Sequence, residues 1–152
     1  MRKLGIVIGT FFGVGFMPLA PGTWASLLTS LIVYFTPLSR LSFLGLAIVT
    51  ATVYAIGIPA AAACERHFQK KDPRPCVIDE VAGQLVCLWM LPRQPGYYIA
   101  AFFLFRLFDI WKPFPVNKSE SLPHGFGIMT DDILAGAYSL AILLIARRFI
   151  IG

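Results

Sequence analysis

Apolar runs and short polar segments alternate along the chain, a pattern typical of membrane helices joined by loops. The first run, residues 4–39, contains no charged side chain, but Pro18, Pro21 and three glycines interrupt it. One spanning helix cannot contain such a break. We therefore expect a re-entrant or interfacial segment at residues 4–16, an irregular loop at 17–23, and a helix at 24–38 that Thr23 caps.

The later runs predict four further helices. Residues 41–63 are uncharged and long enough to cross a bilayer. Residues 65–75 carry four basic side chains and two prolines, so they form a hydrophilic loop, which the positive-inside rule places in the cytoplasm. Helices at 77–92 and 96–111 form an antiparallel pair across a tight proline-glycine turn, and a last helix covers 131–149.

Composition supports this class of protein. The 152 residues are 57% hydrophobic and only 14% charged, with a mean hydropathy of +0.73, which is more apolar surface than a soluble domain of this size buries. We predict one all-α domain over residues 1–152: a small polytopic membrane protein with four to five membrane helices and the N-terminal re-entrant or interfacial segment. The net charge of +5, clustered between apolar runs, favours anionic membrane lipids as partners and not nucleic acid.

Five carboxylates lie at the edges of the apolar segments: Asp79, Glu80, Asp109, Asp131 and Asp132. An acidic side chain at the bilayer centre costs about 2.5 to 3.5 kcal/mol, so these residues need compensation. The predicted topology places all five at the cytoplasmic interface, where they could share a cation. Oxygen ligands without a histidine or cysteine cluster favour magnesium over zinc. As an alternative, each adjacent pair is an ordinary helix start that the macrodipole stabilises.

Basic side chains and glycines near these acids are candidate phosphate ligands. Arg106 and Asp109 are three residues apart on one helix, so they form either an internal ion pair or a phosphate ligand beside a metal ligand. Lys112 begins a proline-fixed loop and is either a phosphate ligand or a snorkelling cation. The segments Pro21-Gly22-Thr23 and His124-Gly125-Phe126-Gly127 precede helices, where backbone N–H groups bind phosphate, although glycine is also common before membrane helices.

Cys87 and Arg93 enclose five residues, which is the spacing of a cysteine-dependent phosphatase loop. Such a loop needs small residues whose N–H groups surround the phosphate. The intervening residues are bulky and apolar, and Arg93 falls on the face opposite the acids. The sequence therefore favours metal-dependent over cysteine-dependent chemistry.

Four blocks of sequence, in this order, resemble bacterial phosphatidylglycerophosphatase A: Pro21-Gly22-Thr23, residues 78–83, residues 105–115 and residues 125–132. The resemblance extends from about Gly13 to Ala141. It implies a magnesium-dependent, all-helical enzyme of the bacterial inner membrane. Its expected reaction removes the terminal phosphate of phosphatidylglycerophosphate and leaves phosphatidylglycerol.

This chemistry suits the residues. A lipid phosphomonoester lies at the membrane interface, where the acids are predicted, and a metal held by carboxylates neutralises charge and polarises a water. The expected metal ligands are Asp79, Glu80, Asp131 and Asp132, one of which acts as general base. Asp109 is a further ligand or orients one. The phosphate oxygens are expected to contact Arg106, Lys112, Gly22, Thr23, His124, Gly125 and Gly127.

A small transporter or channel is the alternative function, because acids within a membrane also mark ion pathways. Transport sites usually lie near the bilayer midplane. The acids of this chain are predicted at one interface, beside glycine loops and Lys112, and that placement favours an enzyme whose active site faces the cytoplasm.

Overall fold

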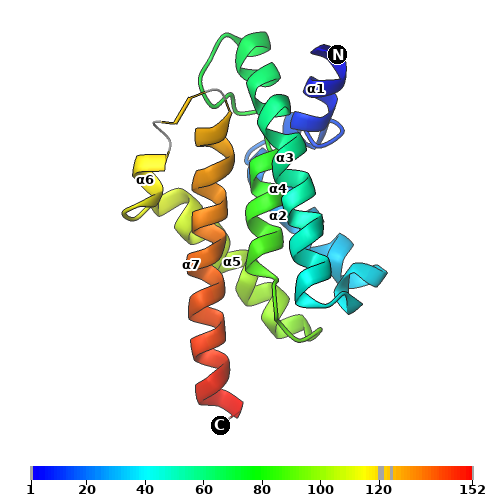
Figure 1. The fold of residues 1–152 in the computed structure, drawn as a ribbon, viewed down its shortest axis with the longest axis vertical. Coiled ribbons are helices and arrows are strands. Elements are labelled where there is room, and N and C mark those ends of the chain that lie inside the picture. The colour runs from blue at the N-terminus through cyan, green and yellow to red at the C-terminus, as the bar shows by residue number, and fades with distance from the viewer. Residues whose placement is uncertain (1, 120–121, 124, 152) are drawn as a thin grey trace.

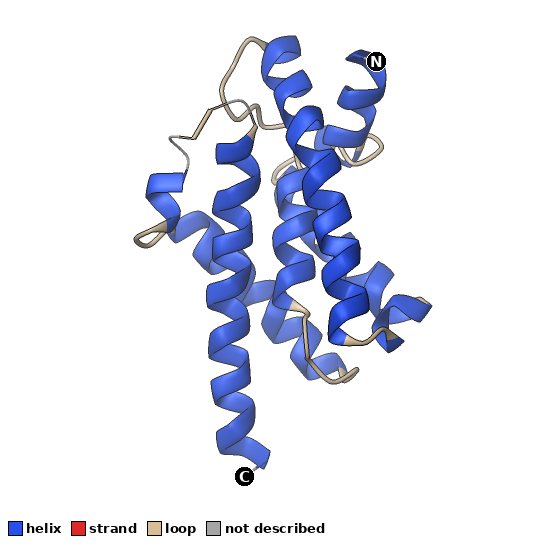
Figure 2. Cartoon of the chain, in the orientation of Figure 1, coloured by secondary structure: helices blue, strands red, loops and turns tan. Residues whose placement is uncertain are grey.

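The computed structural model describes residues 2–119, 122–123 and 125–151 (Figure 1). Within these residues every regular element is a helix and no strand occurs, as Figure 2 shows. The all-α prediction is confirmed.

The N-terminal part contains four short elements: α1 (Arg2–Gly9), η1 (Val14–Phe16), α2 (Pro21–Phe35) and η2 (Pro37–Arg40). The first two elements overlap the segment predicted at residues 4–16, although α1 begins two residues before it, and α1 packs against a later helix, α3 (Phe43–Phe68). The prediction that Thr23 caps the next helix is wrong. Ala20 is the N-cap and Pro21 the first helical residue, because proline has no N–H to lose there and its φ is already helical.

Helix α3 is longer than the run of uncharged residues that predicted it. It continues through Pro59 to Phe68 and ends where Gln69 adopts a left-handed conformation. The predicted hydrophilic loop at 65–75 therefore begins only after residue 68. Charged residues such as Glu65 and Arg66 end a membrane span, but they are good helix formers and do not end the helix itself.

The C-terminal half contains α4 (Ile78–Cys87), α5 (Pro95–Trp111), α6 (Val116–Ser119) and α7 (Phe126–Ile151). Helix α5 agrees with its prediction, whereas α4 ends five residues early. The prediction that the last helix begins at Asp131 is also wrong, since α7 begins at Phe126, directly after Gly125 at a φ of +78°. A positive φ is a glycine conformation, so Gly125 marks the true end of the loop.

Two helices of the described chain, α3 and α7, are long and apolar enough to span a membrane. Both run along the long axis of the molecule, and α7 extends past the other helices at its C-terminal end (Figure 1). Helices α2, α4 and α5 are shorter, at 15, 10 and 17 residues. The structure thus supports a helical membrane protein without confirming four to five membrane helices.

Helix α4 is the centre of the bundle and packs against α2, α3, α5 and α7. Nine of its ten residues are buried, including Asp79 and Gln84, and the tenth, Glu80, is partly buried. Glycines bring α4 and α7 into backbone contact. A Cβ added at Gly83 would lie 2.5 Å from the carbonyl oxygen of Asp132, and one added at Gly136 would overlap the carbonyl oxygen of Gly83. Small residues permit this close approach between membrane helices.

Candidate active site

Helix α4 places two of the predicted acids inside the bundle. Asp79 and Glu80 lie in its first turn, where the helix macrodipole favours a negative charge. The start of α4 is held in place because the backbone N–H of Val77 donates to the carbonyl of Gly9 at 2.8 Å. Asp79 is only 6% exposed, so it is not a solvated surface acid.

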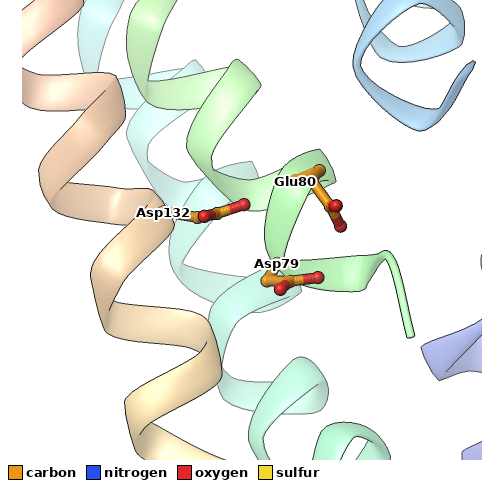
Figure 3. A group of neighbouring side chains, drawn as sticks. All are labelled: Asp79, Glu80 and Asp132. Carbon is orange, nitrogen blue, oxygen red and sulfur yellow. The ribbon is translucent and has the colours of Figure 1, made fainter. Parts of the chain in front are cut away.

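Helix α7 supplies two further acids from its second turn. Because α7 begins at Phe126, Asp131 and Asp132 are its sixth and seventh residues. The macrodipole effect falls off within the first turn, so helix capping does not explain these two carboxylates. Asp132 is 2% exposed and points from α7 toward α4 (Figure 3).

Asp79, Glu80 and Asp132 form a three-carboxylate cluster (Figure 3). One ligand oxygen from each residue lies within 4.8 Å of the other two. Opposite ligands of one magnesium ion are about 4 Å apart, since each Mg–O bond is about 2.1 Å. Within the described chain, Asp79 Oδ1, Glu80 Oε2 and Asp132 Oδ2 are buried without a hydrogen-bond partner. Buried oxygens of this kind carry a large free-energy cost, so the cluster fits a hard cation.

The electrostatics of α4 lead to the same conclusion. Burial, and then the neighbouring Glu80 carboxylate, raises the pKa of Asp79 well above its ordinary value. Burial raises the pKa of Glu80 to about 8. Without a cation, these carboxyls therefore tend to hold protons at neutral pH, and a bound divalent ion would favour their ionised form.

Helix α5 adds Arg106 and Asp109 beside this cluster. Arg106 Nη1 lies 2.5 Å from Asp109 Oδ2 and 3.9 Å from Glu80 Oε1. The Asp109 carboxyl also lies against the carboxyl of Asp132. The ion pair considered from the sequence therefore forms, and it does so at the edge of the three-carboxylate cluster. A guanidinium has five N–H donors, so this pairing leaves donors for another anion.

Helix α2 contributes its first turn through Gly22. A Cβ added at this position would overlap Glu80 Oε1 and lie 3.1 Å from Arg106 Nη1. Only glycine allows the α2 backbone to approach Glu80 and Arg106 so closely. Thr23, the next residue, is half-buried in the same turn.

Asp131 differs from its neighbour Asp132, because Lys112 Nζ lies 2.8 Å from Asp131 Oδ2. The structure therefore brings the predicted phosphate ligand Lys112 to a predicted metal ligand. Asp131 also lines a cavity of about 210 Å³ with Ile128, Lys71 and Asp72. The three-carboxylate cluster does not include Asp131.

Two glycines of the segment predicted to bind phosphate, Gly125 and Gly127, are buried at the start of α7. The position of a Cβ at Gly125 is 2.5 Å from the carbonyl oxygen of Ile58, so this glycine packs against α3. Gly127 is buried in the first turn of α7. His124 lies outside the described residues.

Two polar residues near the acids had not been identified from the sequence. Asp72, in the basic loop, is close enough to act electrostatically on Asp79 and Asp131. Its position in Asp72-Pro73, shortly before the acids of α4, was the available signal. Gln84 is fully buried one helical turn after Glu80, and neither of its side-chain polar atoms has a hydrogen-bond partner within the described residues. Only its spacing of four from Glu80 pointed to it.

The environment of Cys87 argues against cysteine chemistry. This thiol is fully buried, and Cys87 Sγ lies 3.5 Å from the carbonyl oxygen of Ala101. Burial raises the pKa of Cys87 to about 12, whereas a nucleophilic cysteine needs a lowered pKa. Arg93 instead donates to the carbonyl of Tyr34 and stacks over its ring at 5.1 Å.

Comparison with known proteins identifies the family. The family model described as phosphatidylglycerophosphatase A matches residues 7–147. The chain belongs to the phosphatidylglycerophosphatase A family. It is therefore a lipid phosphatase, and the transporter alternative is not favoured.

Three relatives of this family member span most of its length. It is 43% identical over 156 residues to a putative phosphatidylinositol-3-phosphatase of Bacteroides thetaiotaomicron, covering 98% of this chain and 96% of the relative. It is 37% identical to a phosphatidylglycerophosphatase A of Haemophilus influenzae, over 87% of this chain and 82% of the relative. The Escherichia coli phosphatidylglycerophosphatase A is 34% identical, over 87% and 77%. No solved structure matches the chain.

Proposed function

We propose that this lipid phosphatase hydrolyses the terminal phosphomonoester of phosphatidylglycerophosphate, to give phosphatidylglycerol and phosphate, with magnesium bound by Asp79, Glu80 and Asp132. The main supporting observation is the three-carboxylate cluster, whose buried oxygens lack hydrogen-bond partners and lie within 4.8 Å of one another. The family and two named relatives support the substrate. Magnesium, when bound, supplies charge neutralisation and polarises a water molecule or a phosphoryl oxygen.

The residues around the cluster have separate roles in this proposal. Arg106, beside Glu80, donates to the phosphate oxygens with the N–H groups that its pair with Asp109 leaves available. Asp109 holds the guanidinium in place and lies against Asp132, where it could accept a proton from the attacking water. Gly22 and Thr23 present the N-terminus of α2, whose N–H groups favour an anion.

Lys112 and Asp131 form the other side of the proposed site. Their ion pair joins the end of α5 to the second turn of α7. Asp131 would orient the Lys112 ammonium toward an oxygen of the terminal phosphate. The Asp131 carboxylate would act as a further metal ligand only if this pair opened.

A second candidate substrate is phosphatidylinositol 3-phosphate. The relative with 43% identity carries the name putative phosphatidylinositol-3-phosphatase. Both lipids present a phosphomonoester at the membrane interface, so the same cluster could act on either. We place phosphatidylglycerophosphate first because the family description and the two other relatives name it.

Phosphate release from purified protein tests the proposal. The assay compares phosphatidylglycerophosphate, phosphatidylinositol 3-phosphate, phosphatidic acid and soluble glycerophosphate, each with magnesium and with EDTA. We expect the highest kcat/KM on phosphatidylglycerophosphate and no turnover in EDTA. Equal rates on all four substrates would show that the headgroup is not recognised. Full activity in EDTA would refute the requirement for magnesium.

We also propose that the enzyme is a multi-pass protein of the bacterial inner membrane whose active site faces the cytoplasm. Arg147 follows Asp132 by 15 residues on α7, which is about 22 Å of helix, and it donates to the carbonyl of Met90 in the loop after α4. The acids and this loop are therefore at opposite ends of α7. Cysteine labelling should find positions near Lys70 and Lys118 on the cytoplasmic side and Gln94 on the other. Labelling of Lys70 and Lys118 from opposite sides would refute this topology.

A further inference from the structure

An apolar groove lies between α2 and α5, and its lining contains no acidic side chain among the described residues. Its volume is about 460 Å³, within the range of small-molecule sites. Apolar and aromatic side chains line it, among them Leu27, Leu31 and Tyr34 on α2 and Tyr98, Ile99 and Phe103 on α5. We call this feature the α2–α5 groove.

The two helices that form the groove also reach the active site. Gly22 of α2 and Arg106 of α5 both contact Glu80, whereas the rings of Tyr34 and Tyr98 meet at 5.1 Å near the opposite ends of the same helices. Helices α2 and α5 are therefore antiparallel neighbours. Leu27 follows Gly22 by five residues, or about 7.5 Å of helix, so the groove begins close to the proposed phosphate site.

The open side of the groove is apolar as well. Leu31 is 42% exposed, Ile99 57% and Phe103 66%. From Leu27 to Phe35 the lining of α2 extends for about 12 Å along the helix. An extended, flexible and uncharged ligand that enters from the side matches this shape, whereas a polar headgroup does not.

We propose that the α2–α5 groove binds one acyl chain of the lipid whose phosphate lies between Arg106 and Gly22. This inference rests on the proposed function, because it takes the headgroup position from the active site. The arrangement of groove and site follows the chemistry of the proposed substrate: the terminal phosphate at the polar end, then the headgroup glycerol, the phosphodiester and the acylated glycerol, and finally a hydrocarbon chain along the helices. The groove would hold the substrate in register, so that the terminal phosphate reaches the three-carboxylate cluster.

Photolabelling tests the groove without requiring turnover. The probe is phosphatidylglycerol with a diazirine in one acyl chain, added to the full-length protein in detergent micelles. We expect the label in residues 27–35 and 95–103, and a decrease of about tenfold in Leu31→Trp, whose side chain fills the groove. Ile32→Trp is the matched control, since Ile32 is the next residue, is also 42% exposed and does not line the groove.

Other labelling patterns would overturn the proposal. Label distributed over exposed apolar residues such as Leu44 and Phe149 would indicate ordinary contact with surrounding lipid. Labelling that Leu31→Trp leaves unchanged would show that the chain does not enter the groove. Crosslinks from the groove to a second copy of the protein would assign the groove to an interface instead.

Kinetics provide an independent test. In Leu31→Trp we expect the ratio of kcat/KM for long-chain to deacylated substrate to fall about tenfold, the equivalent of about 1.4 kcal/mol. The change should appear mainly in KM, because the chain contacts the groove in both ground and transition states. Equal losses on both substrates would overturn the proposal. If the unmodified enzyme released no phosphate from any lipid, the proposed function would fail, while the photolabelling would still decide the groove.

Discussion

Replacing Gly22 by alanine tests the contact between the start of α2 and the three-carboxylate cluster. The new Cβ would overlap Glu80 Oε1 and lie 2.8 Å from Glu80 Cδ, where carbon atoms in contact are about 3.5 to 4.0 Å apart. The carboxyl group must therefore move by about 1 Å. A displacement of this size at a reacting centre costs about 100-fold in rate, so we expect kcat/KM to fall about 100-fold and the magnesium requirement to rise.

Gly96→Ala is the matched control for this substitution. Both glycines follow the proline that begins a helix, Pro21 in α2 and Pro95 in α5, but a Cβ at Gly96 has no neighbour within 4 Å among the described residues. Alanine at either position favours the helix by up to about 1 kcal/mol, so helix stability alone predicts no loss. Activity in Gly96→Ala should stay within about twofold of the unmodified enzyme.

The assay is phosphate release from phosphatidylglycerophosphate across a magnesium titration, together with circular dichroism. A double variant, Gly22→Ala with Glu80→Gln, separates the mechanism from general damage. It should be no worse than Glu80→Gln alone, because both changes act through one carboxylate. Unchanged kinetics in Gly22→Ala, or additive losses in the double variant, would refute the placement of Glu80 in the metal site.

Three further predictions follow from the same structure. Asp79→Asn and Asp132→Asn should each lower kcat by at least about 100-fold at unchanged helical content, whereas Cys87→Ser should keep most activity. Turnover assays that find the reverse would favour a cysteine nucleophile. Gly136→Ala should lower the free energy of unfolding by about 1 to 3 kcal/mol in thermal melts, since its Cβ overlaps the carbonyl of Gly83, and an unchanged melting temperature would show that α4 and α7 are not in backbone contact. In EDTA the melting temperature should fall as the pH rises from about 5 to 8, because the folded Glu80 carboxyl, with a pKa of about 8, keeps a proton that the unfolded chain has released. Magnesium should reduce this dependence on pH. A melting temperature independent of pH would contradict the raised pKa of Glu80.

The sequence by itself determined the class of the protein and its chemical components. Long apolar runs need helices, since a backbone in lipid must satisfy its hydrogen bonds within its own segment. The five acids and the blocks around Gly22, Asp79, Arg106 and Asp131 carry the family resemblance, and the match over residues 7–147 confirmed it. These properties depend on residue type and order along the chain, which can be observed without coordinates.

The sequence determined the helix boundaries less well, because one local signal is compatible with more than one start of a helix. Thr23 is a good cap by type, yet Pro21 begins α2 two residues earlier. The adjacent acids Asp131 and Asp132 are typical of a helix start, but nothing between Phe126 and Thr130 prevents the helix from beginning sooner. Local preferences are worth about 1 kcal/mol or less, and packing against the rest of the bundle outweighs them.

Only the tertiary structure decided which side chains meet. Successive residues on a helix point about 100° apart, so Asp132 faces α4 while Asp131 faces Lys112. Both residues are aspartates, so residue type alone could not predict which of them joins the cluster. The contact between Gly22 and Glu80 joins positions 58 residues apart, and the α2–α5 groove forms between two helices that α3 and α4 separate in the chain. Such contacts depend on the rotation and spacing of packed helices, which glycines such as Gly83 set through the close approach they permit.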